Sequence, residues 1–67
     1  MSDQPMRDQE MERARDIDSK LYVFEITPTV ALREAKALAQ RTRFKRVADY
    51  CREIEAEAQR RIDQDNA

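Results

Sequence analysis

The chain has 67 residues, one cysteine and no histidine, and this combination limits how it can stabilise a fold. A chain of this length makes one domain at most, and it buries only about 60% of its unfolded surface. Domains of this size commonly depend on a disulfide, a metal or a partner. An internal disulfide needs a second cysteine, and one thiolate without imidazoles cannot make a zinc site. We therefore expect one domain over residues 1–67 that uses no cofactor or metal, and that associates with itself as a homodimer or with a larger protein.

The composition is typical of helices. Charged residues make up 40% of the chain, glycine is absent, and there are only two prolines. Long helices and coiled coils share such a composition. No apolar run approaches the ~20 residues of a membrane span, and the polar N-terminus is unlike a secretory signal. Because a single cysteine also fits a reducing compartment, we expect a mainly α, cytoplasmic protein with no membrane segment.

Pro28 marks the clearest boundary between elements. Thr27 before it is a good N-cap, and proline is favoured at the first position of a helix. Strong helix formers follow, so the sequence predicts a helix over residues 28–42. A second apolar stripe starts at Phe44 and advances by three and four residues along the chain, which is typical of a packed helix. This stripe predicts a further helix over residues 44–63.

The apolar stripes of these two segments would lie on nearly opposite faces of a single straight helix. Such a helix would have to bury one side early and the other side late. We therefore expect a break around residues 41–45. The alternative is a bent or continuous helix, because this region contains neither glycine nor proline. Residues 1–5 and 63–67 are expected to be loose.

Residues 21–26, LYVFEI, allow two interpretations. Five of the six favour strands, but no second strand-like run exists in the chain, so a strand here would have to pair with the same stretch of a second copy. The alternative is one amphipathic helix over about residues 5–25, with an apolar stripe made of Met11, Ala14, Ile17, Leu21 and Phe24. The fold class is therefore mainly α, with two or three amphipathic helices and a short strand at 21–26 as the open alternative.

Two groups of side chains are candidates for binding a partner. The first, here called the seam, is the start of the second apolar stripe and consists of Phe44, Val47, Cys51 and Ile54. The second, here called the basic corner, consists of Arg41, Arg43, Lys45 and Arg46. It belongs to a central segment, residues 20–46, with seven basic and two acidic side chains between acidic flanks. Arginine suits carboxylate or phosphate, so the basic corner fits an acidic protein surface, a nucleic acid, or simply water.

Enzyme chemistry is not expected. Without histidine the usual general base and the Ser-His and Cys-His pairs are missing. Without glycine a phosphate-binding loop cannot be built. The carboxylates lie beside arginines at helical-neighbour spacing, which is typical of surface ion pairs, and Cys51 is expected to be a buried thiol. We predict a non-enzymatic, helical protein–protein interaction module, such as a regulator, inhibitor, chaperone or assembly factor.

The stretch EITPTVALREAKALAQRT also resembles part of the ribbon-helix-helix family of dimeric DNA-binding proteins. The resemblance consists of a strand-like run, a proline and then an apolar helix face formed by Leu32, Ala35, Leu38 and Ala39. It implies paired strands in the DNA major groove and phosphate contacts at the start of the last helix, where Lys45 and Arg46 lie. A dimeric transcriptional repressor or antitoxin is therefore the alternative function.

Overall fold

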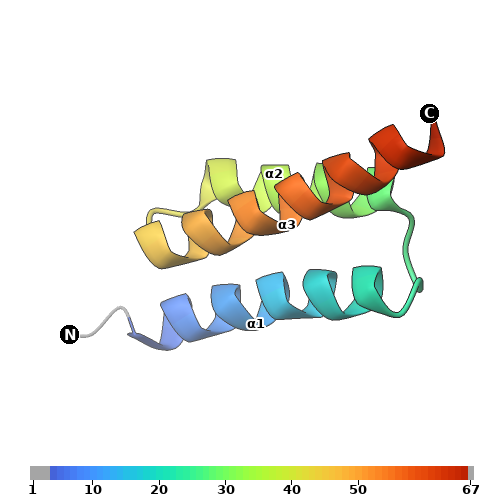
Figure 1. Cartoon of the computed structure of the whole chain (residues 1–67). Coiled ribbons are helices and arrows are strands. Elements are labelled where there is room, and N and C mark those ends of the chain that lie inside the picture. Colours follow the sequence, from blue (N-terminus) through green and yellow to red (C-terminus); the bar gives the residue numbers. More distant parts are fainter. Residues whose placement is uncertain (1–3, 67) are drawn as a thin grey trace.

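The computed structural model describes residues 4–66, and within this range the chain forms three helices joined by two short turns (Figure 1). Helix α1 spans Gln4–Tyr22, α2 spans Pro28–Arg41 and α3 spans Lys45–Asp65. Helices α2 and α3 form a closely packed pair, and α1 lies along one side of it (Figure 1). The predicted mainly α fold is confirmed.

Local capping explains why α2 begins and ends where it does. The side-chain oxygen of Thr27 accepts a hydrogen bond of 3.2 Å from the backbone N–H of Val30, and Pro28 follows in the first turn. At the other end the N–H of Thr42 donates to the carbonyl of Leu38 at 2.8 Å, and the Thr42 hydroxyl accepts from the N–H of Phe44 at 3.2 Å. Both the predicted start at Pro28 and the predicted break before α3 are confirmed.

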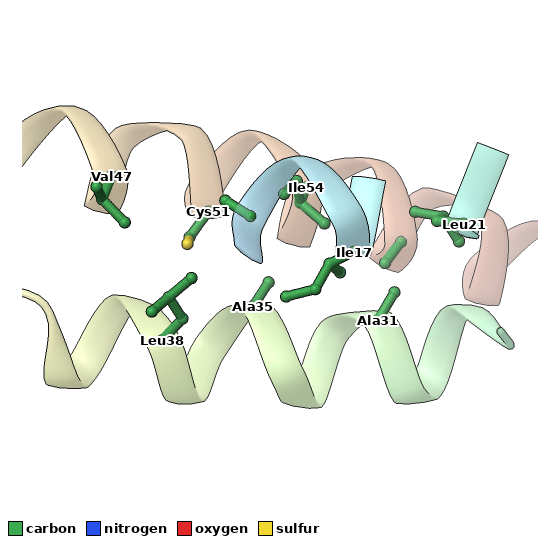
Figure 2. Close-up of a cluster of buried hydrophobic side chains, with 10 residues drawn as sticks. Ile17, Leu21, Ala31, Ala35, Leu38, Val47, Cys51 and Ile54 are labelled. Carbon is green, nitrogen blue, oxygen red and sulfur yellow. The ribbon is translucent and has the colours of Figure 1, made fainter. Parts of the chain in front are cut away.

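The core lies between the three helices and combines branched aliphatic side chains with alanines (Figure 2). Four of its ten buried residues are alanine, which buries less apolar surface than a larger aliphatic side chain does. The helices α1, α2 and α3 contribute, in this order, Ala14, Ile17 and Leu21, then Ala31, Ala35 and Leu38, then Val47, Cys51, Ile54 and Ala58.

Residues 21–26 do not form a strand, so that alternative is wrong. Helix α1 ends at Tyr22, and the next three N–H groups return to its last turn: Val23 donates to Ser19, Phe24 to Leu21 and Glu25 to Lys20. These bonds occupy backbone groups that a strand would have offered to a neighbour. The helical alternative was correct in kind but too long at this end, because Phe24 leaves the helix and does not join the apolar stripe of α1.

Both outer helices extend further than expected at their free ends. Residues 4–5 and 63–65, which we expected to be loose, are helical. A side-chain hydrogen bond of 3.0 Å from Gln59 to Asp63 supports the last turns of α3. Residues 1–3 and 67 lie outside the described part of the chain.

Candidate functional site

The turn between α1 and α2 carries the most exposed large apolar side chains of the described chain. Tyr22 is 75% exposed, Val23 57% and Phe24 82%. We call these three residues the aromatic corner. Scattered single apolar residues are normal on protein surfaces, whereas contiguous exposed apolar patches commonly mark binding sites. Three consecutive exposed residues that include two aromatic rings therefore make this turn a candidate contact surface.

The backbone of the aromatic corner is strained at Phe24. Its φ of 64° lies in the left-handed region, and no other non-glycine residue in the described range has a positive φ. The N–H of Glu25 bonds to the carbonyl of Lys20 at 2.8 Å, and that of Phe24 to Leu21 at 3.3 Å. This is the Schellman pattern, which usually has glycine at the left-handed position. A side chain at this position destabilises the fold by about 1–2 kcal/mol. Because the chain contains no glycine, it carries this strain.

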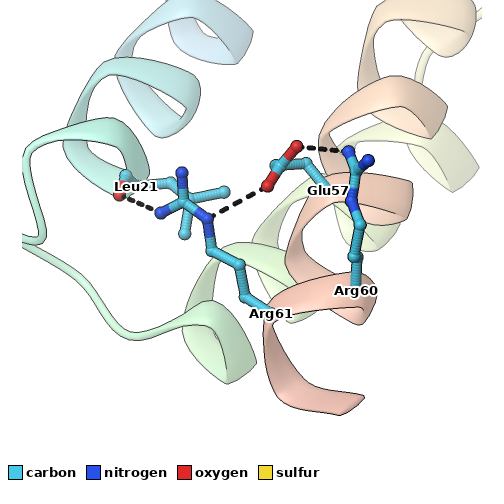
Figure 3. Close-up of polar contacts among 4 residues, drawn as sticks. All are labelled: Leu21, Glu57, Arg60 and Arg61. Carbon is cyan, nitrogen blue, oxygen red and sulfur yellow. Dashed lines mark hydrogen bonds and ion pairs between the residues drawn. The ribbon is translucent and has the colours of Figure 1, made fainter. Parts of the chain in front are cut away.

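Arg61 of α3 reaches the end of α1, where the aromatic corner begins (Figure 3). Its Nη1 donates a hydrogen bond of 2.9 Å to the Leu21 carbonyl, and its Nε donates one of 3.1 Å to Glu57 Oε2. The same guanidinium lies 5.5 Å from the centre of the Phe24 ring. Glu57 also pairs with Arg60, so the carboxylate is held between two arginines. Arg61 therefore fixes both the end of α1 and one face of the exposed ring.

A shallow, open hollow lies beside this ring. It has a volume of about 360 Å³ and is lined by Phe24, Pro28, Arg61, Gln64 and Asp65. Its walls come from the turn, the start of α2 and the last turns of α3. The aromatic corner thus offers both a protruding ring and an adjoining recess with an acidic rim.

The basic corner lies at the opposite end of the molecule, where α2 passes into α3 (Figure 1). The structure brings its four residues together, and all four are exposed. Arg43 is already engaged within the chain, because its guanidinium lies 5.6 Å from the Phe44 ring and its Nη2 lies 4.0 Å from Met6 Sδ. The corner is therefore a positively charged surface with one arginine partly committed.

The structure places the seam inside the chain. Val47 and Cys51 are completely buried, Ile54 is 2% exposed, and all three point into the space between the helices (Figure 2). Phe44 is partly buried against the same core and is the N-cap of α3. A partner could touch the three buried residues only if α1 or α2 moved away. The helical period was read correctly, and its hydrophobic face packs against this chain's own helices.

Two titratable side chains lie against the core next to each other on α3. Burial raises the pKa of the Cys51 thiol, and the nearby Glu55 and Glu10 carboxylates add to the effect. Burial also raises the pKa of Tyr50, whose hydroxyl donates a hydrogen bond of 2.9 Å to Asp18 Oδ2 on α1. Cys51 is thus a buried, neutral thiol, as expected, and Tyr50 fastens α1 to α3.

Sequence reasoning missed the two polar links between α1 and α3. The arginines beside carboxylates were interpreted only as members of surface ion pairs, and Tyr50 was given no role. Their partners, the Leu21 carbonyl and Asp18, are 40 and 32 residues away in the chain, so no local spacing could indicate them. A signal for the strained turn did exist, since α1 has to end before Pro28 in a chain without glycine.

Comparison with known proteins gives no match: no family model, no curated protein and no solved structure is significantly similar to this chain. In the described part of the chain, no helix has the length and apolar content needed to cross a membrane. Residues 4–66 also contain no group of three carboxylate or thiol side chains arranged to hold a metal ion. Function is therefore inferred from the aromatic corner and the basic corner.

Proposed function

We propose that this chain is a small, non-enzymatic, helical protein–protein interaction module that binds its partner through the aromatic corner. The observation that carries the proposal is Phe24, a residue that is 82% exposed and has a left-handed backbone. Strained backbone positions persist where the surrounding structure holds them, and they concentrate at functional sites. A ring that costs folding energy and covers no core is consistent with a role in binding.

The chemistry of the corner agrees with this role. Tyrosine and other aromatic residues are enriched at protein–protein interfaces, and a few such anchors supply most of the binding energy. Arg61 holds one face of the Phe24 ring at 5.5 Å, which reduces the entropy lost when the ring is fixed by a partner. The corner is therefore organised before a partner arrives.

The basic corner supplies the second part of the proposal. Its exposed charges would speed encounter with an acidic surface and orient it, more than add affinity. The small core, with four alanines among ten buried residues, gives the single chain a modest hydrophobic stabilisation, and association would add to it. The proposal covers regulators, inhibitors, chaperones and assembly factors. The single buried thiol fits a reducing compartment, so we place the protein in the cytoplasm.

The test is the substitution Phe24→Gly, which removes the ring and relieves the backbone strain at once. Proteins captured from an extract of the source organism by the wild type and by this variant are quantified by mass spectrometry, and self-association is measured in parallel by sedimentation. We expect Phe24→Gly to weaken binding at least about tenfold, since truncated interface anchors commonly cost more than 1.4 kcal/mol.

The matched control is Met6→Ala, which removes an exposed apolar side chain at the opposite end of the molecule. Because Met6 also touches Arg43 of the basic corner, this variant should weaken binding, if at all, far less than Phe24→Gly does. If Phe24→Gly captures the same proteins in the same amounts and associates with itself as the wild type does, the aromatic corner is not a binding surface and the proposal is wrong.

A further inference from the structure

The charged side chains at the two ends of α3 have the opposite sign to the one that the helix dipole favours at each end. Helix dipoles favour acidic residues in the first turn and basic residues in the last turn. Helix α3 has no acidic residue in its first turn and no basic residue in its last turn. It starts instead with Lys45 and Arg46, and it ends with Asp63 and Asp65. These charges weaken the helix that carries them, so folding of the single chain does not explain them.

This arrangement of charges along α3 also gives the whole molecule a basic end and an acidic end. The turn between α2 and α3, with the basic corner, lies at one end; the aromatic corner and the last turn of α3 lie at the other (Figure 1). The acidic end carries Glu25, Asp63 and Asp65, all exposed. The basic side chains near this end are already paired, Arg60 and Arg61 with Glu57 and Lys20 with Asp16, so Glu25, Asp63 and Asp65 are the charges it offers to a second copy.

We infer that the partner of this module is a second copy of the same chain, packed side by side and antiparallel; this inference rests on the proposed function. An antiparallel pair places the basic end of each copy against the acidic end of the other, and a twofold axis makes the two contacts identical. A parallel pair would bring like charges together. Antiparallel packing also aligns the two α3 dipoles favourably.

The aromatic corner fits into this arrangement. Each phenylalanine of the described chain already has an arginine near its ring, Arg61 with Phe24 at 5.5 Å and Arg43 with Phe44 at 5.6 Å. Because Phe24 is 82% exposed, most of its ring remains available to a basic side chain of the second copy. Stacking of a cation on an aromatic ring becomes stronger as water is removed from the contact. The exposed Ala56, near the middle of α3, allows close approach between copies.

The test uses charge reversals that the helix itself tolerates. One variant carries Lys45→Glu and Arg46→Glu, and the other carries Asp63→Lys and Asp65→Lys. Each reversal gives α3 the charge that its dipole favours, which offsets the loss of the exposed hydrogen bond from Gln59 to Asp63, so melting temperatures at low protein concentration should stay close to that of the wild type. A loss of association therefore cannot be attributed to unfolding.

Self-association is measured by sedimentation equilibrium for the wild type, for each variant alone and for an equimolar mixture of the two. We expect each variant alone to associate at least about tenfold more weakly, because two contacts per dimer become repulsive. The mixture should recover wild-type affinity as a heterodimer, since both of its end-to-end contacts are again between opposite charges. Phe24→Gly should weaken association while the single chain remains folded.

Two results would overturn the inference. One is a wild-type chain that stays monomeric up to about 1 mM; if Phe24 is still needed to capture other proteins, the proposed function stands and only the identity of the partner is wrong. The other is a variant with Lys45→Glu and Arg46→Glu that pairs more tightly with the wild type than the wild type pairs with itself, which indicates parallel copies.

Discussion

Both turns of the molecule end a helix without glycine and place an arginine against a phenylalanine. They nevertheless expose different chemistry, charged side chains at one turn and an aromatic ring at the other. At the turn between α2 and α3, the ring of Phe44 packs against the core and the charges face outward. At the turn between α1 and α2, the ring of Phe24 faces outward and Arg61 lies beneath it. The first arrangement follows the usual rule of burial. The second combines a strained backbone with an exposed aromatic ring, and on this combination the proposed binding surface rests.

Substitution by glycine should change the free energy of unfolding in opposite directions at the two phenylalanines. Phe44→Gly removes a partly buried ring from a backbone of ordinary φ, −97°, and should lower the free energy of unfolding by about 2 kcal/mol. Phe24→Gly relieves a φ of 64° and should raise it by about 0.5–1 kcal/mol. Urea denaturation at low protein concentration measures both. A destabilised Phe24→Gly would mean that the exposed ring supports the fold.

Removing the contacts of Arg61 with the end of α1 and with Phe24 should cause the next largest loss of stability. Arg61→Met keeps the length of the side chain but loses the hydrogen bond to the Leu21 carbonyl and the contact with Phe24. We expect a loss of about 1–2 kcal/mol, seen as a lower urea midpoint. Arg60→Met is the matched control, because Arg60 is more exposed and pairs only with Glu57; it should cost about 0.3 kcal/mol. Equal losses in the two variants would show that Arg61 acts only through Glu57.

A smaller loss of stability than that of Arg61→Met is expected at Tyr50, which holds α1 against α3 between the two turns. Tyr50→Phe loses the hydrogen bond to Asp18 and should cost about 1 kcal/mol, whereas Tyr22→Phe, at an exposed position, should cost nothing measurable. Thermal unfolding of both variants makes the comparison. A Tyr50→Phe variant as stable as Tyr22→Phe would show that the hydrogen bond to Asp18 does not stabilise the packing of α1 against α3.

The same link predicts a dependence on alkaline pH. Burial and the Asp18 contact raise the pKa of Tyr50, and burial raises that of Cys51, so the native state favours both protonated forms. Their contribution to stability is complete below the unfolded pKa values, about 8.5 for cysteine and about 10 for tyrosine, and it is lost as the pH rises through the higher native values. Tyr50→Phe should show a shallower decline above pH of about 10. If stability fell equally steeply with pH in the wild type and in Tyr50→Phe, Tyr50 would not be a source of the alkaline pH dependence.

Much of the helical framework could be predicted from the sequence because its causes are local. Thr27 and Pro28 set the start of α2, and the change of apolar face sets the break near Thr42. The stripe of Val47, Cys51 and Ile54 identified the buried face of α3. What could not be predicted was the partner of that face, since periodicity shows that a side is buried and not against which helix.

The aromatic corner was harder for a different reason. Local propensity favours a strand at Tyr22–Phe24, but the chain offers no neighbour, and the last carbonyls of α1 capture the N–H groups that a strand would need. The position of Arg61 depends on how α3 lies against α1, 40 residues away. Without a strand the resemblance to ribbon-helix-helix proteins loses the element that would contact DNA bases.

The place of Cys51 has a practical consequence. It is the only sulfhydryl in the chain and it is wholly enclosed by the three helices. A thiol-specific dye added to the unmodified protein can react there only when the helices separate. The speed of labelling therefore reports how often the bundle opens, and a slower reaction at higher protein concentration would measure directly how much a neighbouring molecule holds it shut.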